Sequence, residues 1–136
     1  MKTLFTLTLV ALFGVMNAQN PDNLELTITN KRFVEAKYQE FIVFDVRYDN
    51  HTGKDIRGVK GNIIAYDLFG DKLINLAVKV DEGIASGLSH KDVAGFKYNQ
   101  FIEWHGTLKA TELQNMTYEF IPKVIIYTDG TVYKAD

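Results

Sequence analysis

Hydrophobic and polar residues alternate in short segments along most of the chain, and turn-forming residues separate the segments. Leu24 to Thr29 alternates apolar and polar residues, as in a strand with one face in water. Phe33 to Tyr38 is a second strand-like segment. Further segments of this kind cover 40–49, 56–68, 74–80, 93–98, 116–128 and 132–133. Because Val, Ile, Phe, Tyr and Thr dominate these segments, the chain is expected to be mainly β structure.

The run from Glu40 to Val80 contains three of these segments in close succession. The first places Ile42, Phe44, Val46 and Tyr48 on one face, which predicts a central strand. The second places Val59, Gly61, Ile63 and Ala65 on one face, and the short turn Phe69-Gly70-Asp71 joins it to the third. A short turn implies antiparallel pairing. We interpret the whole run as a β-meander, with a polar turn at 50–53 between the first two strands.

Two features of the carboxyl-terminal segments predict local geometry. Pro122 interrupts the longest apolar segment and has no N–H to donate, so we expect a β-bulge or a switch between sheets there. Asp129-Gly130 stands between two alternating segments and predicts a hairpin with a tight primed turn.

The pattern changes between Tyr98 and Asn115. Phe101, Trp104, His105 and Leu108 lie at helical spacing, which predicts one short helical turn over 99–108. Seven or eight short antiparallel strands in a chain of 136 residues favour an all-β fold, a two-sheet sandwich of immunoglobulin-like type. A small barrel is the alternative.

The amino end has the pattern of a secretory signal peptide. Lys2 precedes an apolar run from Leu4 to Val15, and Ala18 offers the small side chain that precedes a cleavage site. We therefore predict a signal peptide over 1–18 and a single domain over 19–136, exported to the periplasm or the cell exterior. Removing residues 1–18 takes away one of the 15 basic residues and none of the 17 acidic ones, so the formal net charge of −2 becomes −3.

Composition limits the partners. The basic residues are scattered singly except for Lys31-Arg32, so neither nucleic acid nor an anionic membrane surface is expected to bind. No second apolar run is long enough for membrane insertion. The chain has no cysteine, which excludes disulfides, thiolate metal sites and a cysteine nucleophile.

Three stretches in the middle of the chain stand out: 50–61 (N-x-T-G-K-D-I-R-G-V-K-G), 65–71 (A-Y-D-L-F-G-D) and 84–89 (I-A-S-G-L-S). Together they resemble the FxLYD family of exported bacterial domains. Tyr66 and Asp67 match the family motif, whereas Ile63 and Ala65 stand where the family has Phe and Leu. The resemblance implies an immunoglobulin-like β-sandwich. It implies no chemistry, because the matching positions are turn and core residues.

The titratable residues suggest no metal or catalytic site. His51, His90 and His105 are expected to be solvated loop histidines, because no two of them lie at metal-ligand spacing. Asp49, Asp55 and Asp71 would suggest a cation only if they converged, and the turn preference of aspartate explains them more simply. No nucleophile elbow or phosphate loop is present, so no catalytic residue, cofactor-binding residue or metal ligand is predicted.

The densest aromatic group is Tyr98, Phe101 and Trp104, with His105 beside them. Such rings stack on sugars or anchor a protein partner. Alternatively they plug one open end of the sandwich, which is the interpretation that we favour. Exposure of the Trp104 ring separates the two, because a binding site needs the ring accessible.

These observations leave three hypotheses about function. The first is an exported, non-catalytic interaction or structural module that binds an unknown protein partner. The second is a carbohydrate or small-ligand binding module that uses Tyr98, Phe101, Trp104 and His105. The third is an enzyme, which would need an ionisable pair such as Glu103 and His105 in a cleft.

Overall fold

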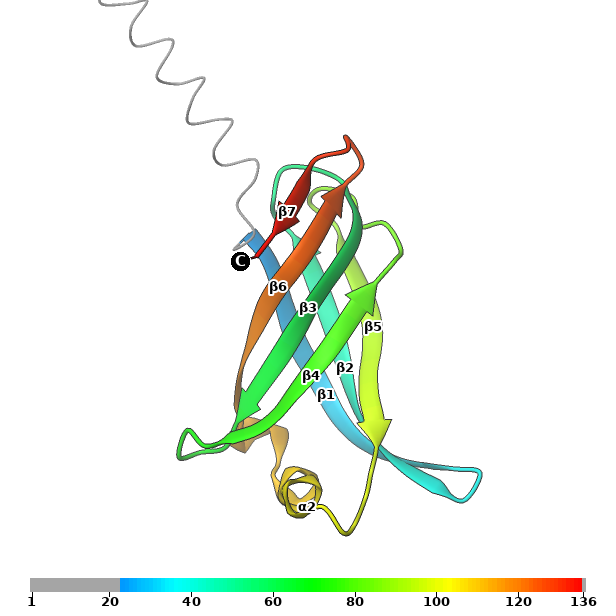
Figure 1. Cartoon of the computed structure of the whole chain (residues 1–136), viewed down its shortest axis with the longest axis vertical. Helices are drawn as coiled ribbons and strands as arrows, with labels where there is room; N and C mark the ends of the chain where they lie inside the picture. Colours follow the sequence, from blue (N-terminus) through cyan, green and yellow to red (C-terminus); the bar gives the residue numbers. More distant parts are fainter. Residues whose placement is uncertain (1–22, 136) are drawn as a thin grey trace, which may run out of the picture.

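The fold is a sandwich of two antiparallel β-sheets, as predicted. A computed structural model describes residues 23–135, so the predicted signal peptide lies outside the described residues. One sheet has the order β1-β2-β5 and the other β4-β3-β6-β7 (Figure 1). The strands are β1 Leu24–Ala36, β2 Gln39–Asn50, β3 Ile56–Tyr66, β4 Lys72–Val80, β5 Ser89–Lys97, β6 Thr117–Tyr127 and β7 Val132–Lys134. The two sheets stay separate, so the barrel alternative is not observed.

The strand order is that of an immunoglobulin-like Greek key. Relative to the constant-type arrangement, the fourth strand lies beside β3 and not beside β5. β2 is the central strand of its sheet, as predicted, since it pairs with β1 on one side and β5 on the other.

The predicted meander over 40–80 is wrong at its first turn. β2 and β3 belong to different sheets, and of the three strands only β3 and β4 form a hairpin, with the antiparallel pairing that was predicted. The segment between β2 and β3 carries the chain across the sandwich because both strands bury one face, and these two faces meet in the core.

The Asn50 side chain holds this crossing in place and is fully buried. Its Nδ2 donates to the carbonyl oxygens of Lys54 and Ile84, each at 2.8 Å. Its Oδ1 accepts from the backbone N–H of Thr52 at 3.0 Å and from the Thr52 hydroxyl at 2.7 Å. Every polar group of this amide therefore has a partner, which a buried amide requires.

Three local predictions can be compared with the structure. The segments at 24–29 and 33–38 belong to one strand, β1, which ends at Ala36 and has a register shift between Ile28 and Asn30; Lys37 and Tyr38 lie in the turn that follows it. The predicted bulge at Pro122 is confirmed, because Lys60 pairs with Val124 and Gly61 with Pro122. The Asp129-Gly130 hairpin also forms, but only Gly130 has a positive φ, whereas a primed type I turn needs two.

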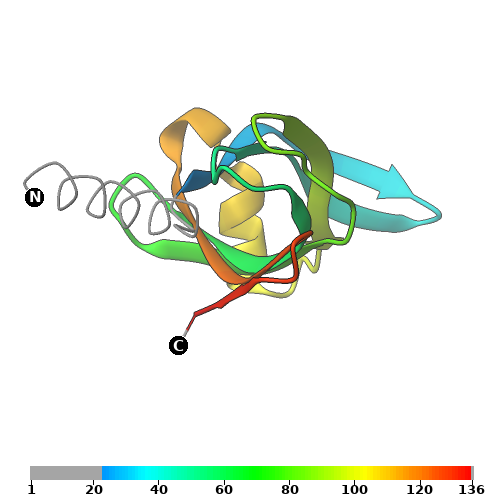
Figure 2. The ribbon, with the colours of Figure 1, turned by 90° about the horizontal axis from the view of Figure 1, so that it is seen from above.

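The core lies between the sheets and is closed at one end by a short helix. The predicted strand faces are the buried ones, with Ile42, Phe44, Val46 and Tyr48 each at most 2% exposed. The helix α2, Glu103–Ala110, lies across the end of the sandwich and is followed by the 3-10 turn η2, Leu113–Asn115 (Figures 1 and 2). Leu108 and His105 are its buried residues. A helical segment was predicted at this position.

Candidate interaction site

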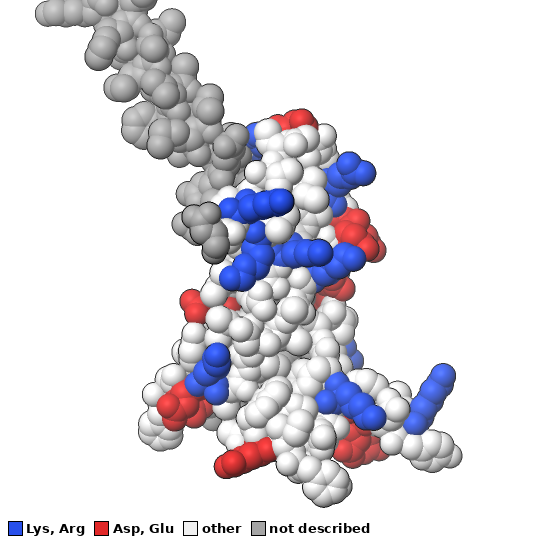
Figure 3. All heavy atoms as spheres, viewed as in Figure 1, with Lys and Arg blue, Asp and Glu red and all other residues white. Residues whose placement is uncertain are grey.

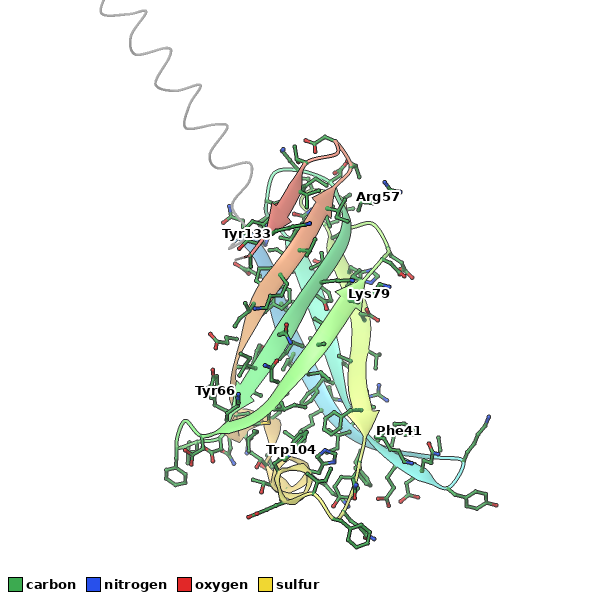
Figure 4. All side chains as sticks on the ribbon, viewed as in Figure 1. Phe41, Arg57, Tyr66, Lys79, Trp104 and Tyr133 are labelled. Atoms are coloured by element: carbon green, nitrogen blue, oxygen red, sulfur yellow. The ribbon has the colours of Figure 1, made fainter. Side chains whose placement is uncertain are left out.

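The predicted aromatic group comes together at the helix end of the sandwich. Tyr98 follows β5, Phe101 lies in the turn before α2, and Trp104 and His105 lie on the first turns of the helix. The rings of Trp104 and His105 have centroids 4.0 Å apart, and Phe96 of β5 lies 4.9 Å from the His105 ring. Figure 4 places Trp104 at this end of the molecule.

His105 is a buried helix residue and not the solvated loop histidine that was predicted. It is 6% exposed, and its Nδ1 accepts the backbone N–H of Asn99 at 2.9 Å. An accepting Nδ1 carries no proton, so the neutral ring has its proton on Nε2. His105 therefore fixes the loop that leads from β5 into α2, and with Leu108 it plugs the sandwich.

Two other aromatic residues of the group face solvent. Phe101 is 87% exposed and Trp104 is 41% exposed. The Trp104 ring packs against Phe96 and His105, which leaves part of the indole accessible. The group thus divides into a buried plug and an exposed surface, so neither of the two interpretations describes all four residues.

A hairpin arm extends beyond the sandwich next to this surface. It is the distal part of β1 and β2, and it projects to one side in Figures 1 and 2. Ala36 pairs with Gln39 at its tip, so the turn consists of Lys37 and Tyr38 alone. Both residues have a positive φ, 51° and 65°, and the Tyr38 side chain is fully exposed.

The arm is anchored to the helix end by stacked side chains. The rings of Phe33 and Tyr98 meet edge to face, with centroids 5.4 Å apart. The ammonium group of Lys109 lies 4.0 Å from the Phe33 centroid and 5.0 Å from that of Tyr98. Lys31 of β1 donates to the carbonyl oxygens of Lys109 and Thr111 at the end of α2. Burial lowers the pKa of Lys31, and Glu112 opposes that shift.

A hollow of about 1110 Å³ separates the arm from the loop before α2. The arm lines it from Glu35 to Glu40, and the other wall comes from 97–102 together with His105. Its charged residues have both signs: Glu35 and Glu40 against Lys37 and Lys97. We name Tyr38, Phe101 and this hollow the arm site. Tyr98 and His105 also line the hollow, whereas Trp104 lies outside it.

The sequence pattern places Tyr38 at the end of a strand-like segment, whereas in the structure it lies in the turn of the arm. The turn residues, Lys37 and Tyr38, are not a pair such as Asn-Gly or Asp-Gly that predicts a two-residue hairpin turn. The only available signal was the abrupt end of alternation after Tyr38, followed by the more apolar segment from Glu40.

The remaining titratable residues are dispersed. His51 is exposed in the predicted loop, whereas His90 lies half-buried on β5, 3.9 Å from a Glu82 carboxylate oxygen. Asp49 accepts from Ser89 and Arg47, which lower its pKa in that order of importance. Asp55 accepts the Ser86 N–H at 2.8 Å, and Asp71 lies in the loop at the other end of the sandwich. Within residues 23–135 no three His, Asp or Glu side chains form a group that could hold a metal ion.

The sequence matches no family model and no curated protein. A solved structure described as "X-ray structure of Northeast Structural Genomics Consortium target SoR45" is similar at 10% identity and a TM-score of 0.44, over 84% of this chain and 81% of that chain. Among the described helices, none is long and apolar enough to cross a membrane.

Proposed function

We propose that this protein is an exported, non-catalytic β-sandwich that binds a protein partner through the arm site. The observation that carries the proposal is the pair of left-handed residues at the tip of the arm, Lys37 and Tyr38. The signal-peptide pattern of residues 1–18 supports export. The resemblance to exported FxLYD domains supports it too, and it also rests on the sequence alone.

The backbone conformation of Lys37 and Tyr38 at the tip is energetically unfavourable. A left-handed conformation costs a residue with a Cβ atom about 1–2 kcal/mol, and Asn-Gly would adopt the same turn at a lower cost. Tyr38 makes no packing contact that would offset this cost, because its side chain is fully exposed. Strain of this kind at an exposed position favours a role for the side chain in binding.

The surroundings of Tyr38 suit a protein partner. Tyr38 and Phe101 stand on either side of the hollow, and exposed aromatic residues are frequent energetic centres of protein interfaces. Carboxylates and ammonium groups of the hollow offer both acceptors and donors to a polypeptide.

Carbohydrate binding is the second candidate function. It rests on a separate observation, the partial exposure of the Trp104 ring at 41% beside Phe101. Aromatic faces of this kind can stack on sugar rings.

The test uses a photo-reactive amino acid in place of Phe101 in the protein produced in its native host. We expect irradiation to give a cross-linked adduct of one defined mass. The same label in place of Val93, which is exposed on β5, is the control and should give no such adduct.

The decisive variant combines Lys37→Asn with Tyr38→Gly in the Phe101-labelled protein. We expect it to be more stable than the parent by about 1 kcal/mol, because the strain is relieved, and to lose the adduct. An adduct that survives in this variant would refute the role of the tip. If no adduct forms at all, and an oligosaccharide protects Trp104 from acrylamide quenching, carbohydrate binding replaces the proposal.

A further inference from the structure

Basic residues that are far apart in the sequence gather on the outer face of the four-stranded sheet. Lys79 of β4 pairs with Lys60 of β3, Lys60 pairs with Val124 of β6, and Val124 pairs with Lys134 of β7. One row across the sheet therefore holds three lysines. Adjacent strands lie about 4.8 Å apart, so the row spans about 14 Å. Arg57 lies at the same end of the sheet, and we name these four residues the basic face.

The figures show how this face is arranged. Basic atoms gather over the upper half of the four-stranded sheet, with acidic atoms at its margins (Figure 3). Arg57 and Lys79 lie at this upper end, whereas Tyr66 lies at the opposite end of the same sheet (Figure 4).

The basic face forms no ion pairs among the residues that the structure describes. All four side chains are exposed, and within residues 23–135 the ion pairs involve other residues. Lys60 and Lys79 stand directly opposite each other, an arrangement of like charges that destabilises a sheet. The chain is acidic overall, so this concentration of positive charge does not follow from composition.

The surface between the cations is apolar and hollowed. Ile126 is 39% exposed and Val132 is 50% exposed, and these two residues pair with each other beside the row. Gly58 pairs with Ile126 and contributes no side chain, which helps to open a hollow of about 740 Å³. Arg57, Lys60, Lys79 and Lys134 line this hollow, with Asp81 among the other lining residues.

We propose that the basic face docks on the surface of a bilayer that contains anionic phospholipids. Lysine side chains reach phosphate groups on flexible apolar stems, and exposed aliphatic residues between them contact the boundary of the acyl region. Each basic residue near such a surface contributes favourably, and the effect falls off within a Debye length, so the acidic remainder of the molecule does not cancel it. The lining residues of the hollow include no aromatic ring on which a sugar would stack.

The test measures co-sedimentation of the purified protein with vesicles. One set contains phosphatidylglycerol and phosphatidylcholine in equal parts, and the other contains phosphatidylcholine alone. We expect binding to the first set at low salt, a marked loss at high salt, and no binding to the second set.

Two matched triple variants locate the surface. Lys60→Gln, Lys79→Gln and Lys134→Gln together should weaken vesicle binding by about 100-fold, at about fivefold per lysine. Lys37→Gln, Lys72→Gln and Lys91→Gln remove the same net charge from exposed positions elsewhere and should change binding by less than about fivefold. The first variant should fold at least as stably as the parent, because it removes the repulsion between Lys60 and Lys79.

Several results would overturn the proposal. Equal losses in the two triple variants would mean that net charge alone drives binding. Equal binding to both sets of vesicles would exclude a role for anionic lipid. Absence of vesicle binding would also refute the proposal, and binding of soluble heparin in that case would assign the basic face to a soluble polyanion.

Discussion

Replacing Asn50 with aspartate tests whether the crossing between the two sheets depends on one side-chain amide. At neutral pH the substitution removes both N–H donors that Lys54 and Ile84 accept at 2.8 Å. It leaves the two carbonyl oxygens facing a carboxylate at a site where Asn50 is fully buried. A buried polar group that loses its partner costs about 1–3 kcal/mol, so the expected destabilisation is about 2–6 kcal/mol. That is a large part of the typical stability of a domain, about 5–15 kcal/mol.

The loss should depend on pH in a defined direction. Burial and the two facing carbonyls raise the pKa of the new carboxyl group in the folded state above its unfolded value of about 3.9. Below the unfolded pKa the group is protonated in both states, and its O–H replaces one of the lost donors. As the pH rises through the interval between the two values, the unfolded state releases the proton first, and stability falls. Destabilisation relative to the parent should therefore be smaller at pH values near the unfolded pKa than at neutral pH.

The assay is urea unfolding at acid and at neutral pH, followed by Trp104 fluorescence and by far-ultraviolet circular dichroism. Asn62→Asp is the matched control, since its amide makes one bond to Asn75 at 2.9 Å in an exposed position, and it should change stability by less than about 0.5 kcal/mol. Thr52→Val removes the hydroxyl that bonds to Asn50 Oδ1 at 2.7 Å and to the backbone of Lys54, but leaves the Asn50 amide in place, so it gives a milder variant with an expected loss of about 1 kcal/mol. If N50D stays within about 1 kcal/mol of the parent at neutral pH, or loses more stability in acid, the Asn50 amide does not stabilise the crossing in the way described.

Three further predictions concern single residues. The buried Tyr127 hydroxyl has no hydrogen-bond partner in residues 23–135. Tyr127→Phe should therefore leave the free energy of unfolding unchanged or raise it by about 1 kcal/mol. A loss of more than about 1 kcal/mol in urea unfolding would mean that the hydroxyl does form a hydrogen bond. Burial raises the pKa of Tyr48 to about 12; absorbance of tyrosinate should therefore show a late-ionising group, and stability should fall as the pH rises from about 10 towards 12. The hydroxyl and N–H of Thr131, with Lys54, lower the pKa of Asp129. Stability should fall as the pH drops below the unfolded value of about 3.9, and Asp129→Asn should reduce that dependence.

How far the sequence predicts this fold can be judged from particular segments. Ile42, Phe44, Val46 and Tyr48 were assigned to one buried face from alternation alone, and all four are buried. Alternation is a local property, because successive side chains of a strand point to opposite sides wherever the strand lies. For the same reason the bulge at Pro122 could be predicted from one residue that lacks a donor.

The choice of partner strand could not be predicted in the same way. The alternating patterns of 40–49 and 56–68 are compatible with a hairpin between the two strands or with a crossing from one sheet to the other. Contacts between distant segments decide which of the two forms. Asn50 receives its carbonyl partner from Ile84, which lies 34 residues later in the chain. The pattern of apolar and polar residues does not predict that contact.

The candidate sites, too, could be predicted from the sequence only in part. The sequence identified the aromatic residues of 98–105, but it could not separate buried His105 from exposed Phe101, because helical spacing does not state which face meets the core. The arm site also needs the β1–β2 hairpin to project beside that loop, and the sequence treated Tyr38 as the end of a strand.

By itself, the sequence determined which segments form strands, the buried faces of the alternating ones and the helical segment, because each follows from the periodicity of neighbouring residues; it did not show that 24–29 and 33–38 belong to one strand or that β5 begins at Ser89. Only the tertiary structure decided which strands share a sheet, where the chain crosses between sheets, and which charges become neighbours. Lys60, Lys79 and Lys134 are scattered along the chain, which is why neither nucleic acid nor an anionic membrane surface was expected from the sequence. Pairing of β4, β3, β6 and β7 places them in one row, since register brings residues together that are many positions apart.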